Sequence, residues 1–250
     1  MNFICSCWEC AFERKHGLLY VPFQQQGIYR ITCGNGHRII FIVQEHPFEV
    51  LFHIASNAVI DGYYREAITS FAASLERFYE FTVRVLLLAR GLDHSLIDAS
   101  WKAITDKSER QLGACIALWS AHFMEPPKML SRTLVEFRND VVHKGIIPTQ
   151  DKALDFGQAI LDLIATQRDK LKASCHAEIN AVVMNRNASL IRSVAGEPKV
   201  GVATVDSAVG LLSSQSEPLK QVIERMRRDR HGIDMAVRAL DGFSRQVDGC

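Results

Sequence analysis

The chain has 250 residues, which is long enough to bury a hydrophobic core and to form one domain or two. Hydrophobic residues make up 48% of it and charged residues 23%, as in an ordinary globular protein. The formal net charge of +1 excludes nucleic-acid binding driven by overall charge, so any such contact must be local.

The sequence also argues against a membrane or secreted protein. No apolar run is long enough to span a bilayer, so we expect no membrane partner. Residues 1–15 lack a basic leader followed by an apolar segment, so we expect no signal peptide. Four of the seven cysteines lie within the first 33 residues, which favours a metal site in a reducing compartment over a disulfide framework. We therefore expect a cytoplasmic protein.

Residues 1–45 are expected to form a small β module with a metal site. Extended segments are predicted at 18–23, 27–32 and 38–43. Cys7 and Cys10 form a C-x-x-C pair, and Cys33 and His37 form a C-x-x-x-H pair. Two such pairs on turns between strands are typical of a zinc ribbon, because four nitrogen or sulfur ligands complete a tetrahedron. The predicted cofactor is a structural Zn²⁺, since four protein ligands leave no open coordination position.

Two alternatives remain open for these cysteines. Cys5 is a spare thiol that could replace Cys7 or Cys10 as a ligand. The cysteines could also be reduced and buried without a metal, with His37 at the surface. A segment this small has little core of its own and would need a cross-link such as a bound metal ion, which favours the metal site.

Residues 46–174 are expected to form an all-α bundle with short connections. Apolar residues at helical spacing predict helices at 48–60, 63–90, 92–104, 110–123, 130–145 and 151–173. The long helix 63–90 is expected to bury Phe71, Leu75 and Phe78 against the helix 130–145. The predicted fold class is therefore mainly α, a helical bundle preceded by a small β zinc ribbon.

Residues 175–250 form a C-terminal helical or irregular extension in this interpretation. Helices are predicted at 179–194 and 218–230, with a loop or an extended segment at 195–216 between them. The arginines between 225 and 230 could contact RNA phosphates. Glu224 and Asp229 are interleaved with them, so a solvated helix face is the simpler interpretation.

The helix 130–145 carries the residues of greatest chemical interest. Its apolar stripe consists of Leu130, Leu134, Phe137 and Val141, and Gly145 is placed to cap its C-terminus. Three polar residues lie off this stripe and near the helix end: Arg138, Asn139 and His143. A guanidinium, an amide and an imidazole at one helix end are suited to handling a phosphate group.

These residues resemble a signature of the HEPN superfamily, in which an arginine is followed after four to six residues by a histidine. A polar residue often comes directly after the arginine, as Asn139 does here. The segment RNDVVHKG, and SFAASLERFYEF on the long helix, are both similar to this superfamily over about residues 48–173. One departure is Gly145, because toxins controlled by nucleotidyltransferase antitoxins usually have a tyrosine there. Control of that type is therefore not expected.

The resemblance implies an HEPN-like helical bundle and a metal-independent endoribonuclease of the toxin or antiviral-defence type. Its partners would be RNA, a second copy of the chain and an antitoxin or another defence protein. Attack by the RNA 2′-hydroxyl on the adjacent phosphorus would cleave the strand. His143 would move the proton, and Arg138 would stabilise the phosphoryl oxygens. Asn139 would either orient His143 or donate a hydrogen bond to the scissile phosphate.

Other interpretations stay open. Arg138 could simply pair with an acid such as Glu76 or Glu80 on the long helix, and His143 could be only a cation at a helix C-terminus. The protein could then be a non-catalytic RNA-binding or adaptor protein with the HEPN fold. A zinc-ribbon DNA-binding regulator is less well supported, because residues 1–44 lack a basic surface.

Overall fold

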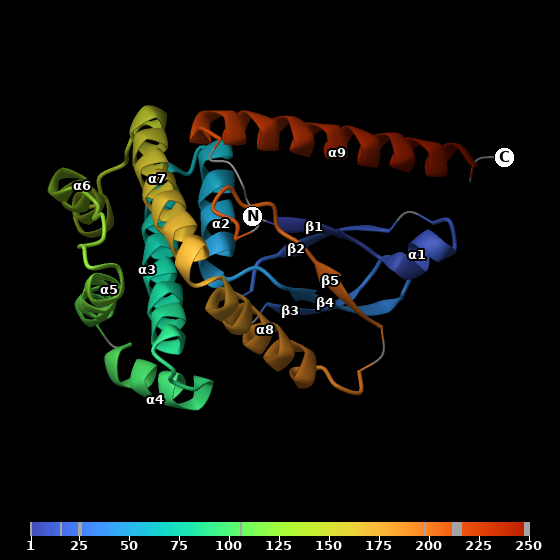
Figure 1. Cartoon of the computed structure of the whole chain (residues 1–250). Helices are drawn as coiled ribbons and strands as arrows, with labels where there is room; N and C mark the ends of the chain where they lie inside the picture. The colour runs from blue at the N-terminus through green and yellow to red at the C-terminus, as the bar shows by residue number, and fades with distance from the viewer. Residues whose placement is uncertain are drawn as a thin grey trace.

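The computed structural model describes residues 2–15, 17–24, 27–105, 107–197, 199–211 and 217–247, with the backbone alone for residues 2, 234 and 236–247. It is mainly helical, with a small N-terminal β region, as the sequence predicted. Figure 1 shows the helices α3 to α7 on one side of the molecule and the strands on the other, with α9 beginning beside the upper end of α7 and running above α2 and the strands.

The N-terminal β region is built from two hairpin-like pairs. Strand β1 (Asn2–Ser6) pairs antiparallel with β2 (Leu18–Pro22), and the short helix α1 (Trp8–Phe12) lies between them in the chain. Strand β3 (Ile28–Thr32) pairs antiparallel with β4 (Arg38–Val43). The three predicted extended segments are confirmed as β2, β3 and β4, whereas β1 and α1 were not predicted.

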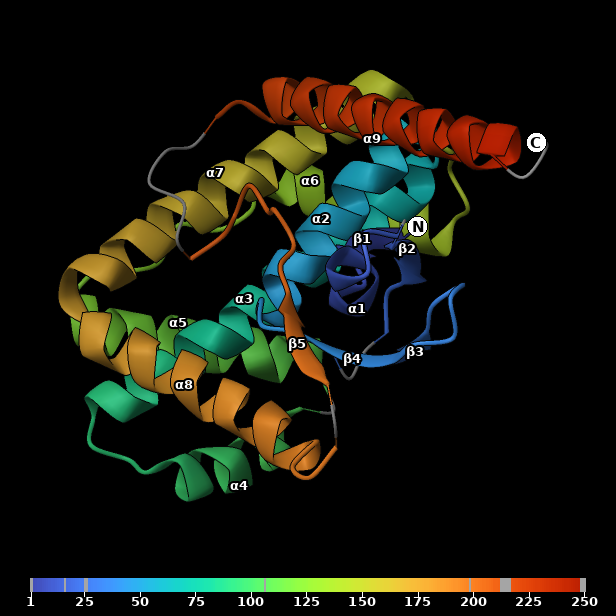
Figure 2. The ribbon, with the colours of Figure 1, turned by 90° about the vertical axis from the view of Figure 1, so that its right-hand side faces the viewer.

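A strand from far along the chain completes the second sheet. β5 (Val200–Ala203) lies parallel to β4, with Ile40 opposite Val200 and Val43 opposite Ala203 (Figure 2). For segment 195–216 the sequence predicted either a loop or an extended segment, and β5 lies within it. Part of the 175–250 segment therefore shares a sheet with residues of the 1–45 segment, a contact that the sequence did not predict.

The bundle contains α2 (Pro47–Ile60), α3 (Tyr64–Ala89), α4 (His94–Ile104), α5 (Ser108–Phe123), α6 (Arg132–His143) and α7 (Gln150–Ser174). These agree with the six predicted helices to within about two residues at each end. Helix α3 is central, since it contacts α2, α4, α5, α6, α7 and α8. Its Phe71, Leu75 and Phe78 are buried, as predicted, and burial of such side chains is the main force holding the bundle together.

Two further helices follow the bundle. Helix α8 (His176–Ser193) begins three residues earlier than predicted, immediately after Cys175 at the end of α7. Helix α9 (Leu219–Val247) continues well beyond residue 230, where the sequence placed its end. Its first turns are anchored by the buried Leu219, Val222 and Ile223, and it contacts α2 and α7. Among the described helices, none combines the length and apolar character that a membrane span requires.

Candidate functional site

The N-terminal cysteines and His37 converge on one point between α1 and the β3–β4 turn. Cys7 lies directly before α1 and Cys10 within it, while Cys33 and His37 lie on either side of the turn. Cys10 Sγ lies 3.6 Å from Cys33 Sγ. His37 Nδ1 lies 3.7 Å from Cys7 Sγ, 3.4 Å from Cys10 Sγ and 3.6 Å from Cys33 Sγ. The four side chains thus present their ligand atoms within 4.8 Å of one another.

These separations fit a tetrahedral metal ion. Metal–sulfur bonds of about 2.3 Å and metal–nitrogen bonds of about 2.0 Å place tetrahedral ligands roughly 3.5–3.8 Å apart. The three cysteine side chains are buried and His37 is partly exposed. The residues predicted as ligands therefore form a candidate metal centre. Cys5 is not part of this group; it faces Leu19 in the neighbouring strand, and burial raises the pKa of its thiol to about 11.

Contacts around the centre orient its ligands. Glu13 Oε1 lies 3.2 Å from His37 Nε2, which leaves Nδ1 facing the three sulfurs. Asn35 Nδ2 donates a hydrogen bond to Cys10 Sγ at 3.2 Å. Burial acts to raise the pKa of the Cys33 thiol, but backbone hydrogen bonds at His37 and Asn35 outweigh it and lower that pKa to about 7. A thiol that ionises readily is a better metal ligand.

Gly17 is required by the packing at this centre. A Cβ atom there would lie 2.7 Å from Cys10 Cβ and 2.9 Å from the carbonyl oxygen of Cys7. The Cys7 backbone N–H also donates to the Gly17 carbonyl at 2.7 Å. Sequence reasoning missed Glu13, Gly17 and Asn35, because no spacing rule connects them to the ligand pairs.

The second predicted site lies on α6. This helix begins where the Ser131 hydroxyl accepts a hydrogen bond from the Leu134 N–H at 3.4 Å, an N-cap contact. It ends at His143, and Gly145 follows with φ +71°, the left-handed conformation of a C-terminal glycine. Val141 is buried and Phe137 is half-buried against the core, so α6 packs on α3 through the predicted apolar stripe.

Arg138 is held by two acceptors. Its Nη2 lies 2.8 Å from Glu76 Oε1 on α3, and its Nη1 donates to Asn139 Oδ1 at 3.0 Å. The ion pair is partly exposed, with about one third of each side chain accessible to solvent. Glu80, the other predicted partner, instead bonds to Arg77 and Arg84. Arg138 therefore pairs with Glu76, which was one of the two acids named as its possible partners.

A cavity of about 270 Å³ opens beside this ion pair, between α3, α5 and α6. Arg138, Asn139 and Glu76 line its polar side, and Leu75 and Leu112 belong to its apolar side.

His143 stands apart from this cavity. Its side chain is exposed at the last residue of α6, and it forms no hydrogen bond within the described part of the chain. The structure therefore brings Arg138 and Asn139 together and leaves His143 on the surface one turn later.

Exposed apolar side chains surround α6. Val135 on α6 itself and Met129 before it are each 41% exposed, and Ile147 after it is 80% exposed. Ile146 is exposed as well. Apolar side chains gathered around one exposed helix are typical of a surface that another protein covers. Sequence reasoning missed this feature, because it considered only the inward-facing stripe of Leu130, Leu134, Phe137 and Val141.

Comparison of the chain with models of known protein families, with curated proteins and with solved structures found no match.

Proposed function

We propose that the protein is a metal-independent endoribonuclease of the HEPN type, active in toxin or antiviral-defence systems. The observation that carries the proposal is the placement of Arg138 and His143. Arg138 is oriented by Glu76 and Asn139 at the surface, and the exposed His143 ends the same helix. An oriented cation and an exposed imidazole are the two kinds of group that phosphodiester cleavage uses.

In the proposed reaction the RNA 2′-oxygen attacks the adjacent phosphorus as the bond from phosphorus to the 5′-oxygen breaks. The 2′-hydroxyl loses a proton and the leaving 5′-oxygen gains one. His143 serves in this proton transfer, since an imidazole titrates near neutral pH. Arg138 offers its remaining N–H groups to the non-bridging phosphate oxygens. The products are a 2′,3′-cyclic phosphate and a 5′-hydroxyl.

A second copy of the chain completes the site in this proposal. Arg138 and His143 are five residues apart, which places them about 140° apart around a straight helix. A twofold axis near Gly145 would set Arg138 of one copy beside His143 of the other. Such a dimer would bury the exposed apolar residues Met129, Val135, Ile146 and Ile147.

The proposed metal ion has a structural role and takes no part in the reaction. We propose Zn²⁺ at Cys7, Cys10, Cys33 and His37, because three thiolates and one imidazole in a tetrahedral arrangement suit this ion. The four protein ligands would leave it no open position for substrate.

A non-catalytic RNA-binding or adaptor protein is the second candidate function. It is favoured by the ion pair between Arg138 and Glu76, which a purely structural arginine would also form. His143 lies outside the cavity that Arg138 lines, and this also favours the non-catalytic candidate.

Cleavage of total cellular RNA distinguishes the two candidates. The wild-type protein is expected to release fragments with 2′,3′-cyclic phosphate and 5′-hydroxyl ends, with or without EDTA. His143→Ala is expected to abolish this product. His231→Ala is the matched control, since His231 is also exposed on a helix and follows Arg225 with five intervening residues. Full activity of His143→Ala, or intact RNA with the wild type, would support the adaptor.

A further inference from the structure

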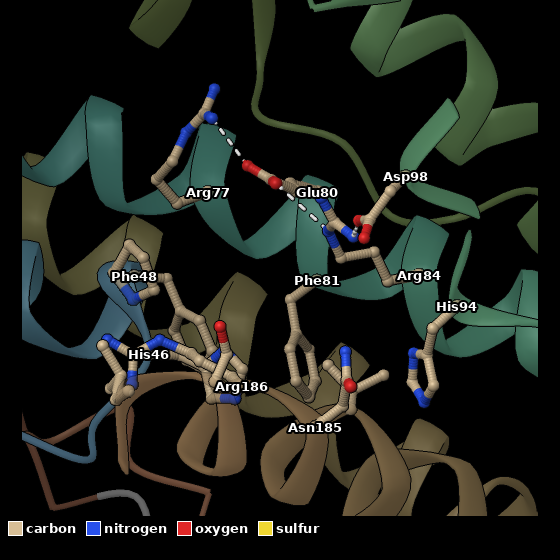
Figure 3. A pocket seen from close by; sticks show the side chains of 14 residues that line it. His46, Phe48, Arg77, Glu80, Phe81, Arg84, His94, Asp98, Asn185 and Arg186 are labelled. Carbon is tan, nitrogen blue, oxygen red and sulfur yellow. Dashed lines mark hydrogen bonds and ion pairs between the residues drawn. The ribbon is translucent and has the colours of Figure 1, made fainter. Parts of the chain in front are cut away.

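The cavities of the molecule differ in how many of their polar groups are free to bind a ligand. One cavity, of about 330 Å³, lies where the start of α2 meets α3, α4 and α8. Figure 3 shows Glu80 on one wall between Arg77 and Arg84, which it contacts at 2.6 and 3.1 Å. On the other wall Arg186 donates to two backbone carbonyls, and His46 is only 6% exposed. The polar groups of this cavity are therefore largely occupied or buried.

The cavity of about 270 Å³ between α3, α5 and α6 is different, because Tyr79 of α3 lines it with an unused hydroxyl group. Tyr79 is only 6% exposed, yet its hydroxyl has no hydrogen-bond partner within the described residues. This oxygen is not among the unpartnered polar atoms that the protein encloses completely, so a ligand in the cavity can reach it. Burial raises the pKa of the phenol, which therefore stays protonated and can donate as well as accept. Buried tyrosine hydroxyls usually have a partner, and a ligand would supply the one missing here.

Two further groups on the same cavity have hydrogen-bonding capacity left over. Asn139 Oδ1 accepts from Arg138 Nη1, which leaves the Nδ2 amide of Asn139 as a donor without a partner in the described part of the chain. Glu76 Oε1 accepts from Arg138 Nη2, and Oε2 remains as an acceptor. Both side chains are only partly buried. The cavity thus offers an accessible donor and an accessible acceptor besides the hydroxyl of Tyr79.

Much of the remaining accessible lining is apolar. Leu112 of α5 and Leu130 are half-buried, while Met129 and Val135 are each 41% exposed at the rim. Apolar walls with a few polar groups are suited to a flat heterocycle, whose faces are apolar and whose edge forms hydrogen bonds. The volume lies just below the range of about 300–1,000 Å³ that whole drug-sized ligands occupy, so the cavity fits one ring system of a larger ligand.

The charge of the cavity favours a neutral ligand. Its lining holds one arginine, Arg138, against two carboxylates, Glu76 and Glu109. Arg138 is already paired with Glu76, so the cavity has no excess of positive charge with which to draw in an anion. A nucleobase is neutral, has apolar faces and carries both donors and acceptors on its edge. It therefore matches the lining in charge, shape and hydrogen bonding.

We propose that this cavity receives one base of the RNA, next to the phosphate that Arg138 contacts, and that Tyr79 helps to select which base enters. The proposal rests on the proposed function, which names RNA as the substrate, and it adds that cleavage depends on the base beside the scissile bond. An unstacked base of single-stranded RNA can be turned into such a cavity and read along its edge. In the proposed dimer the second copy would lie over Met129 and Val135 and close the cavity around the base.

Nucleoside binding tests the cavity without any cleavage. Calorimetry on the full-length protein would use adenosine, guanosine, cytidine and uridine as separate probes. One is expected to bind at least about tenfold more tightly than the weakest, and Tyr79→Phe should remove most of this difference. Tyr63→Phe is the matched control, since Tyr63 directly precedes the same helix, is 60% exposed and does not line the cavity. Absence of binding by all four nucleosides, or equal effects of the two substitutions, would overturn the proposal.

Cleavage of short RNAs that differ only in the base beside the scissile bond separates this proposal from the proposed function. The wild type is expected to prefer one base, and Tyr79→Phe should reduce that preference. Equal cleavage beside all four bases would overturn the base site and leave the endoribonuclease in place. Nucleoside binding that depends on Tyr79, with no RNA cleaved, would support the base site and contradict the endoribonuclease.

One measurement locates the ligand without any variant. Met129 lines the cavity, whereas Met124 is 87% exposed and lies outside it. In a methyl spectrum of the wild-type protein, the Met129 resonance should shift on addition of the bound nucleoside, and the Met124 resonance should stay in place. Binding that leaves Met129 unchanged would place the ligand elsewhere and overturn the proposal.

Discussion

Arg138 is held between Glu76 on α3 and Asn139 on its own helix, with about one third of its side chain accessible to solvent. The arginine and its neighbour Asn139 stand out by spacing in the sequence, and Glu76 was one of two acids expected near it. The structure distinguishes between them, because Glu76 faces α6 while Glu80 faces Arg77 and Arg84. The cavity beside Arg138 had no counterpart in the sequence, because it depends on how three helices pack.

The candidate metal centre was predictable at the same scale for a local reason. Its ligands come in two pairs, each within four residues, so the spacing is visible without knowing the fold. The supporting residues Glu13, Gly17 and Asn35 follow no such rule. His46 and Arg186 were likewise invisible, since they are 140 positions apart and only the fold brings them to one cavity.

Glu49 gives a prediction about pH. Burial raises the pKa of its carboxyl group to about 7, even though the backbone N–H groups of Leu211 and His46 donate to it. The folded state therefore binds a proton more tightly than the unfolded state. The stabilisation from protonated Glu49 should be complete below pH 4.5 and should be lost as the pH rises to about 7. It amounts to at most about 3 kcal/mol of unfolding free energy.

Urea unfolding of the wild type and Glu49→Gln between pH 4.5 and 8 measures this pH-dependent contribution to the unfolding free energy. As the pH rises, the unfolding free energy of the wild type should fall relative to that of Glu49→Gln. Comparing the two proteins matters, because His46 contributes with the opposite sign: its lowered pKa makes stability rise between about pH 3 and 6.5. A difference that stays constant across the range would contradict the prediction.

At the scale of elements, regular periodicity decided what could be predicted. The helices α2 to α7 carry apolar residues at helical spacing and were placed closely. The strand β5 is only four residues long, and its Val200 and Val202 are 40% and 54% exposed, so it has no clear local pattern. It forms because β4, some 160 residues earlier, offers an edge for pairing. Sequence alone contains little information about such a distant contact.

Gly201 tests whether β5 is packed as described. A Cβ atom at this position would lie 2.4 Å from the Trp8 ring, so Gly201→Ala forces the ring or the strand to move. We expect a loss of about 1–3 kcal/mol in unfolding free energy and a change in Trp8 fluorescence. Gly113→Ala is the matched control, because that helical position has open space around it and should gain about 0.5–1 kcal/mol. Equal effects of the two substitutions would show that β5 does not contact Trp8.

At the scale of the whole molecule, the described residues form two main hydrophobic cores and a small third cluster of Ile40, Ile42 and Val194. Of the two main cores, the larger one belongs to the helices, and the smaller one contains Cys7, Cys10 and Cys33 together with residues of β3, β4 and β5. Three of the four candidate metal ligands, Cys7, Cys10 and Cys33, belong to the smaller core, and none belongs to the larger one. The bound ion is therefore expected to support the β region without being needed for the helical bundle.

Metal removal tests this separation. The purified protein should contain one ion per chain, and zinc is the expected element. Chelation or Cys33→Ser should loosen the β region, seen as lost near-ultraviolet dichroism, while the helical far-ultraviolet signal remains. Cys115→Ser provides a comparison, since this cysteine is buried in the helical core. Protein prepared without chelator and free of metal, or complete unfolding on chelation, would contradict this account.

The most direct test of the proposed function is to mix two inactive variants. Arg138→Ala and His143→Ala should each fail to cleave RNA, because each removes one group from every site. After mixing and subunit exchange, half of the dimers are mixed, and each mixed dimer has one intact site formed by Arg138 of one chain and His143 of the other. Cleavage should therefore return to about one quarter of the wild-type rate. No recovery in a mixture shown to contain mixed dimers would contradict a site shared between two copies of the chain.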